Sequence, residues 1–181
     1  MIFDFIPDQD IRKNLENAVD FILVLIEKQK DASESDTSLY MEEINRVLIL
    51  YIVSIIEALL SYIYHLHPDK MTRLEYKEIK EIGKNYINSK IAGKVVAAVQ
   101  VHVERQSSEI TLKSLIEFLQ HKKILKKETA EAIRKFNHIR NSVHLSKARK
   151  GEGCSVDLVE EAVHLLIKVR AGSRKAIVSF K

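Results

Sequence analysis

The residues best suited to chemistry lie in one short segment, residues 134–144, which reads RKFNHIRNSVH. At about 100° per residue of an α-helix, one polar stripe collects Asn137, Arg140, Asn141 and His144. An apolar stripe runs directly beside it, made of Ala132, Phe136, Ile139 and Val143. Charged groups next to a buried seam need partners or a ligand, so this predicted helix is the first candidate for a functional site.

These side chains could act on a phosphodiester. A histidine titrates near neutrality and can take a proton from a ribose 2′-hydroxyl or give one to a leaving oxygen. An arginine can hold the negative charge of a phosphorane-like centre, and the two asparagines could orient a phosphate or a hydroxyl. Such a scheme requires no metal and no cofactor. The alternative interpretation is a surface Arg140 and His144 one helical turn apart, with Asn141 near the helix end.

The composition indicates which fold carries this segment. The chain has 181 residues, with five Gly, two Pro and 46% hydrophobic residues. Sheets need frequent turns, and turns consume Gly and Pro, so the composition disfavours a sandwich or a barrel. The length suits a single domain over residues 1–181, and we predict an all-α fold, an up-and-down bundle of six or seven helices.

Hydrophobic spacing and capping signals place the helices of this bundle. The predicted helical segments are 8–30, 39–66, one that begins at the capping box of Thr72 and Glu75, 88–104, one that begins at Thr111, 128–147 and 156–180. A polar linker is predicted over 31–38 and a loop over 151–155. The segment 88–104 also alternates like a strand, because it is rich in β-branched valines, so a strand remains open there.

The net charge of +4 conceals a strong asymmetry along the chain. Residues 8–43 contain ten acids and four bases, whereas residues 121–150 contain ten Lys or Arg and two Glu. A basic stretch of this kind suits a partner that carries phosphates. The alternative is a solvated helix face that complements the acidic region, and Lys122, Lys123, Lys126 and Lys127 are interpreted as solvating a loop between helices.

Several features bear on the compartment. The N-terminus has an acid within its apolar stretch and lacks the pattern of a signal peptide, and the single Cys154 suits a reducing compartment. Residues 47–64 are mostly apolar and carry a single charge, at Glu57. A carboxylate in the middle of a membrane span costs about 2.5–3.5 kcal/mol. We therefore expect a core helix, a cytoplasmic protein and no membrane association.

Metal chemistry finds little support in the sequence. His65 and His67 could offer two imidazoles to a metal, but no acid or cysteine stands nearby at a suitable spacing, so a helix end before Pro68 is the preferred interpretation. We expect no metal site.

The segment NHIRNSVHL, residues 137–145, resembles the signature of the HEPN superfamily (higher eukaryotes and prokaryotes nucleotide-binding domain). In that signature an Arg and a following polar residue precede a His. The layout is also similar, because a long apolar second helix carries an acid, here Glu57, and the Arg and His come late in a helical chain. Members commonly have four to six residues between Arg and His, whereas three residues intervene here, a spacing that still keeps both on one helix face.

The resemblance implies a HEPN-like homodimer in which the two Arg-Asn-x-x-His helices form one composite cleft. It also implies a metal-independent endoribonuclease acting on RNA, as a toxin beside a nucleotidyltransferase-type antitoxin or as a phage-defence effector. By position, Arg140 and His144 would be the catalytic pair and Asn141 a polar helper, with Asn137 and Glu57 in supporting roles. Glu57 would orient Arg140 or His144, or would simply be a core acid satisfied by a base or a tyrosine.

Two other functions remain open at this point. Some relatives in the superfamily only bind nucleotides, RNA or protein partners, so a non-catalytic HEPN module is the alternative. In the third hypothesis, the chain is a structural dimerisation or antitoxin-type protein, in which Arg140, Asn141 and His144 only cap a helix and pair across an interface.

Overall fold

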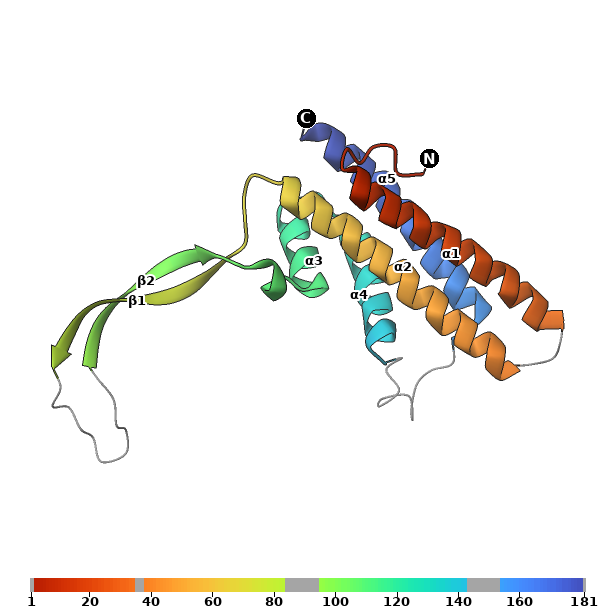
Figure 1. Cartoon of the computed structure of the whole chain (residues 1–181), viewed down its shortest axis with the longest axis horizontal. Helices are drawn as coiled ribbons and strands as arrows, with labels where there is room; N and C mark the ends of the chain where they lie inside the picture. Colours follow the sequence, from red (N-terminus) through yellow and green to blue (C-terminus); the bar gives the residue numbers. More distant parts are fainter. Residues whose placement is uncertain (1, 35–37, 84–94, 143–153, 181) are drawn as a thin grey trace, which may run out of the picture. The chain divides into compact units, whose positions relative to one another are not determined.

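The computed structural model describes residues 2–34, 38–83, 95–142 and 154–180, and over these residues the protein is mostly helical (Figure 1). The described elements are α1 (Gln9–Glu34), α2 (Ser38–Leu66), β1 (Thr72–Gly83), β2 (Val95–Glu104), a short 3-10 turn (Ser107–Glu109), α3 (Leu112–His121), α4 (Lys127–Ser142) and α5 (Val156–Ser179). The described residues thus contain five α-helices, where the sequence predicted six or seven.

The chain divides into two compact units. Met1–Pro68 and Thr111–Lys181 make one of them, which holds all five α-helices and is called the helical unit below. Asp69–Ile110 make the other, which holds both strands and is called the hairpin unit.

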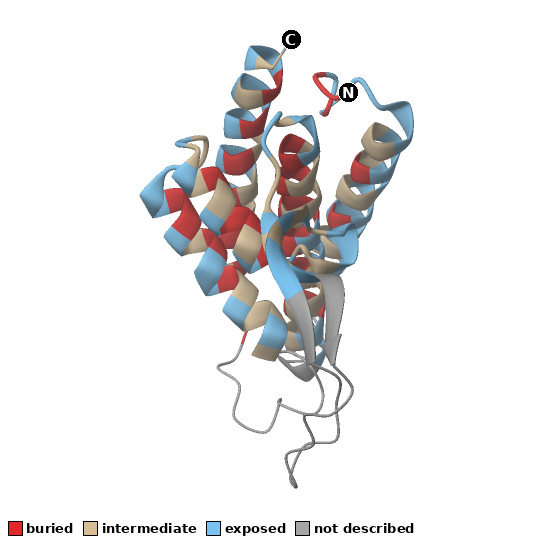
Figure 2. Ribbon diagram, turned by 90° about the vertical axis from the view of Figure 1, so that its left-hand side faces the viewer, coloured by how far each residue is buried: buried red, intermediate tan, exposed pale blue. Residues whose placement is uncertain are grey.

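Helix α2 is the centre of the helical unit, because it packs against each of the other four helices (Figure 1). Its core positions are almost completely buried, namely Leu48, Ile49, Ile52, Val53, Ile55, Ile56, Leu59, Leu60, Ile63 and Tyr64. Each such side chain contributes about 1.5–3 kcal/mol when it leaves water. Figure 2 shows buried and exposed positions alternating along the surrounding helices, as expected for helices with one apolar face.

The stretch Tyr40–Leu66 of α2 is long and apolar enough to cross a membrane by length and composition, and 56% of its most apolar window is buried inside the protein. The core helix of a soluble protein meets the same criterion of length and composition.

Local capping explains where several helices begin. The Asp8 carboxylate accepts hydrogen bonds from the backbone N–H groups of Asp10 and Ile11, both at 3.0 Å, and α1 starts as predicted. Thr111 caps α3 by accepting from the N–H of Ser114 at 3.2 Å. The predicted ends of α2 and α5 agree with the structure to within a residue, whereas α1 continues to Glu34 into the predicted linker. Residues 143–147 of the predicted 128–147 helix lie outside the described residues.

The helix predicted from Thr72 onward is wrong where the structure describes it, and over 95–104 the structure has the strand that the sequence left open in place of a helix. β1 and β2 pair antiparallel, with Thr72 opposite Glu104 and Tyr76 opposite Gln100. Two physical reasons account for the difference. The Thr72 and Glu75 pair mimics a capping box, but Glu75 instead bonds Arg73 within the strand. The valines of β2 pack better on a pleated strand than on a helix.

Gly172 offers a stability prediction, because a glycine inside a helix costs about 1 kcal/mol relative to alanine. A Cβ atom added at Gly172, in the interior of α5, would meet nothing within 4 Å. Gly172→Ala is therefore expected to raise the free energy of unfolding by about 0.5–1 kcal/mol, measured by chemical denaturation. The neighbouring exposed Ala171→Gly is the matched control and should lower it by a similar amount. Destabilisation by Gly172→Ala would contradict the described environment.

Candidate functional site

Helix α4 carries the predicted polar stripe, and its packing sets the direction in which that stripe faces. Ala130, Ile133 and Phe136 are buried on one side of α4, and α4 packs against α2, α3 and α5. Its charges also suit a helix, because Glu128 lies in the first turn and Arg140 in the last, where the helix dipole favours each sign. The buried seam therefore holds Arg140 at the boundary between α4 and α2.

The structure brings Arg140 and Glu57 together. Nη1 of Arg140 donates a hydrogen bond to Oε2 of Glu57 at 2.5 Å, joining α4 to the middle of α2 across 83 sequence positions. The side chains are 22% and 35% exposed, so the pair is partly screened by water. This contact fits both interpretations of Glu57, as a group that orients Arg140 and as a core acid satisfied by a base.

The Arg140 guanidinium retains donors beyond that contact. It has five N–H groups in a planar fork, and Glu57 is its only hydrogen-bond partner within the described part of the chain. The remaining N–H groups can bind an anionic group of a ligand while the carboxylate of Glu57 holds the other side of the fork. Such a clamp on a developing charge is the electrostatic part of many phosphoryl-transfer sites.

The two asparagines of the stripe have different surroundings. Asn137 is half-buried, and its Oδ1 atom is buried without a hydrogen-bond partner among residues 2–34, 38–83, 95–142 and 154–180. An unpaired buried amide oxygen costs about 1–3 kcal/mol, so Asn137 has an acceptor to offer. Asn141 is exposed, one residue before the end of α4. His144 lies outside the described residues, two positions beyond Ser142.

His65 and His67 are the two histidines that the sequence offered as possible metal ligands, and the structure describes an aromatic contact for His67. His67 packs edge-on against the rings of Phe118 and Phe180, with centroids 5.3 and 5.5 Å apart. α2 ends at Leu66, one residue earlier. Over the residues that the structure describes, no group of three or more His, Cys, Asp or Glu side chains is placed to hold a metal ion.

Sequence reasoning did not single out three positions on α5 that line a cavity of about 640 Å³ in the helical unit. They are Lys168, Gly172 and Lys175, spaced four and three residues apart on one helix face. That spacing is visible in the sequence, but the sequence predicts only a solvated loop for the turn after α3, which also lines the cavity.

Cys154 gives a second prediction. Its side chain is buried, and burial raises the pKa of the Cys154 thiol above its usual value, although the guanidinium of Arg46 lowers it. A raised pKa leaves less thiolate at pH 8, and the thiolate is the reactive form. We expect the native protein to react with a disulfide reagent such as DTNB at least about tenfold more slowly than the guanidinium-unfolded chain. Equal rates in the two states would show that the thiol is accessible and unperturbed.

A comparison of the chain with protein-family models, with curated proteins and with solved structures finds no match.

Proposed function

We propose that the chain is a HEPN-type, metal-independent endoribonuclease whose site is built around Arg140. The observation that carries the proposal is the contact between Arg140 and Glu57, because it fixes the guanidinium of the resembling motif on an acid of the central helix. The basic stretch of residues 121–150 adds a favourable field for a polyanionic substrate. The proposal includes a homodimer with a composite cleft and a role as a toxin or phage-defence effector, paired in the toxin case with a nucleotidyltransferase-type antitoxin.

In the proposed reaction, a ribose 2′-hydroxyl attacks the adjacent phosphorus while His144 removes its proton. Arg140 stabilises the additional negative charge of the phosphorane-like transition state. The bond from phosphorus to the 5′-oxygen then breaks, and that oxygen receives a proton from a histidine, His144 of the same or of the partner subunit. The products are a 2′,3′-cyclic phosphate and a 5′-hydroxyl. Asn137 and Asn141 would orient the phosphate or the ribose.

The test is cleavage of labelled single-stranded and hairpin RNA by the purified chain in EDTA. The proposal expects cyclic phosphate ends, cleavage unaffected by EDTA, and loss of cleavage in His144→Ala. His138→Ala is the matched control, because His138 is an exposed histidine on α4 and is expected to retain activity. Full activity of purified His144→Ala, or cleavage that requires a divalent metal, would refute the mechanism.

A second candidate is a non-catalytic HEPN module that binds RNA, a nucleotide or a protein partner. The observation that favours it is the ion pair itself, because Glu57 already compensates the charge of Arg140. This candidate predicts RNA binding with a steep dependence on salt concentration and no cleavage under any condition. Size-exclusion mass with and without RNA would test the dimer in either case.

A further inference from the structure

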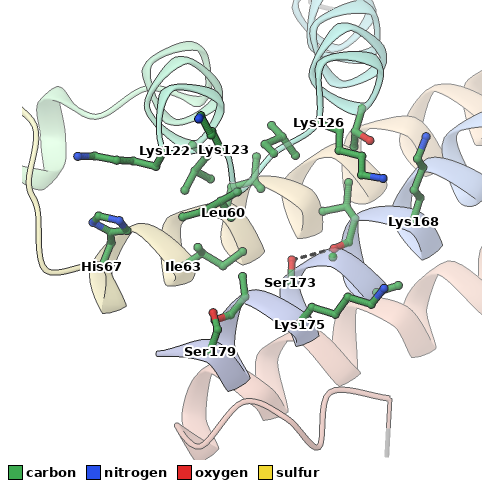
Figure 3. A pocket seen from close by; sticks show the side chains of 18 of the residues that line it. Leu60, Ile63, His67, Lys122, Lys123, Lys126, Lys168, Ser173, Lys175 and Ser179 are labelled. Atoms are coloured by element: carbon green, nitrogen blue, oxygen red, sulfur yellow. Dashed lines mark hydrogen bonds between the residues drawn. The ribbon is translucent and has the colours of Figure 1, made fainter. Parts of the chain in front are cut away.

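A basic cavity lies in the helical unit, apart from the Arg140 site. It is lined by the end of α2, the turn between α3 and α4, and the C-terminal half of α5, and its volume is about 640 Å³. Figure 3 shows Leu60 and Ile63 of α2 in the middle of this cavity, with His67 towards one side and Lys126, Lys168 and Lys175 towards the other. Arg140, Glu57 and Asn137 are not among its lining residues.

The cavity concentrates positive charge. Five lysines line it, Lys122, Lys123, Lys126, Lys168 and Lys175, and none of its lining residues is an Asp or a Glu. Within the described part of the chain, Lys123, Lys126, Lys168 and Lys175 form no ion pair with a carboxylate. These four side chains are exposed, so water and salt screen their mutual repulsion, and an anion held among them would be attracted by several positive charges at once.

The remainder of the lining is largely apolar. It includes Leu60, Ile63, Leu119, Ile124, Leu125, Val169, Ala176 and Phe180. The hydroxyl of Ser173 is already used, because it donates to the carbonyl oxygen of Val169 at 2.9 Å. Leu60, Ile63, Leu119 and Val169 are almost completely buried, so the apolar surface that a ligand can cover belongs to the partly exposed Ile124, Leu125, Ala176 and Phe180. A ligand that carried only charge would leave this surface in water, so the lining favours a molecule that also has an apolar body.

Two lining positions depart from the local preference of the backbone, and they do so in opposite ways. Gly172 stands inside α5, where most residues form a better helix, and the space beside its α-carbon is open. Lys123 has a φ of 58°, in the left-handed region that favours glycine, directly after the cap of α3. Both residues line the cavity, and the local backbone explains neither choice. Departures of this kind concentrate at functional sites.

We propose that this cavity binds a small amphipathic organic anion, a molecule with an apolar body and a phosphate or carboxylate head. The head lies among Lys126, Lys168 and Lys175, and the apolar body lies against Ile124, Leu125 and Phe180. An RNA backbone matches the lysines but not the apolar lining. The inference does not depend on the proposed endoribonuclease activity, because the two sites share no residue.

Isothermal titration calorimetry of the full chain with three probes tests the proposal. Octyl phosphate has both parts of the ligand, octanol has only the apolar body, and inorganic phosphate has only the head. Octyl phosphate, kept below its micelle concentration, is expected to bind at least about tenfold more tightly than either of the other two, because it uses both parts of the cavity. Decanoate distinguishes a preference for a carboxylate head from one for a phosphate head, and tight binding of either supports the proposal.

Two kinds of variant locate the binding. Lys168→Ala/Lys175→Ala is expected to weaken octyl phosphate binding about tenfold or more. The matched control Lys13→Ala/Lys113→Ala removes the same charge from two exposed lysines outside the cavity and should change binding less than about twofold. Gly172→Leu keeps every lysine but fills the open space beside α5, so it should also weaken binding about tenfold, with helical content and thermal stability preserved.

Four outcomes would overturn the proposal, and the first three concern the probes and variants above. They are equal binding of octyl phosphate and inorganic phosphate, unchanged binding in a well-folded Gly172→Leu, and equal losses in the cavity variant and its control. A fourth is binding of an oligouridylate that depends on Lys168 and Lys175 while octyl phosphate does not bind, which would assign these lysines to a nucleic-acid surface.

Discussion

Alanine in place of Arg140 is expected to slow RNA cleavage by about 100- to 1000-fold, the loss typical when one charge-stabilising group is removed from a transition state. The reason is that Arg140 is the cation of the motif that the structure describes. Glu57 is the one hydrogen-bond partner of its guanidinium within the described residues, which leaves further N–H donors for a phosphate. The rate is measured by single-turnover cleavage of labelled RNA at saturating protein, so that weaker binding is separated from slower chemistry.

Two variants make this result interpretable. Arg140→Lys keeps a cation for Glu57 but loses the planar fork, so it should preserve folding and still lose most of the activity. Arg134→Ala removes an exposed arginine of the same helix, whose described partner is the side chain of Gln120, and should retain activity. Wild-type rates in Arg140→Ala would remove Arg140 from the reaction and leave the binding module as the better function.

Asn45→Ala is expected to lower the free energy of unfolding by about 2–3 kcal/mol. Asn45 is 2% exposed. Its Nδ2 donates to the carbonyl oxygen of Cys154 at 2.7 Å, and its Oδ1 accepts from Nε2 of Gln29. Removal of this amide leaves a buried donor on α1 and a buried acceptor just before α5, and each unpaired group costs free energy. Chemical denaturation monitored by circular dichroism measures the change.

The control for this prediction is Asn17→Ala, because Asn17 is exposed on α1 and should change stability by less than about 0.5 kcal/mol. A loss below 1 kcal/mol in Asn45→Ala would mean that water satisfies Gln29 and the Cys154 carbonyl, and that the cluster does not join α1, α2 and the start of α5.

The helical part of the fold was predictable because its signals are local. Asp8, Thr111 and the apolar spacing of α2 and α5 each act within a few residues, and the structure agrees with them. The hairpin was not predictable by the same route. Thr72 and Glu75 carry a helix-start pattern, and its failure depends on pairing with residues about thirty positions later, which local propensity does not include.

In the candidate site too, local sequence signals predicted some features, whereas others depend on contacts between distant residues. Helical periodicity put Arg140 beside an apolar stripe of which Phe136 is buried, whereas Ala132 and Ile139 are only half-buried. The apolar surroundings of Glu57 in the sequence marked it as an acid that needs a partner. Their contact depends on how α4 packs on α2 and could only be offered as one alternative. The cavity lysines of α5 were harder to find, because Lys168 and Lys175 gain their meaning only from a turn that is distant in sequence.

The hairpin unit is also a place where this chain could gain or lose residues during evolution. Thr72 pairs with Glu104, and the N–H of Arg105 donates to the carbonyl oxygen of Met71 at 2.9 Å, so the two ends of the hairpin lie next to each other. An inserted segment with adjacent ends can grow or shrink at little entropic cost, since loop closure depends only logarithmically on length. Residues 69–110 are therefore a natural point for evolutionary insertion and deletion, or for grafting another module between the second and third helices.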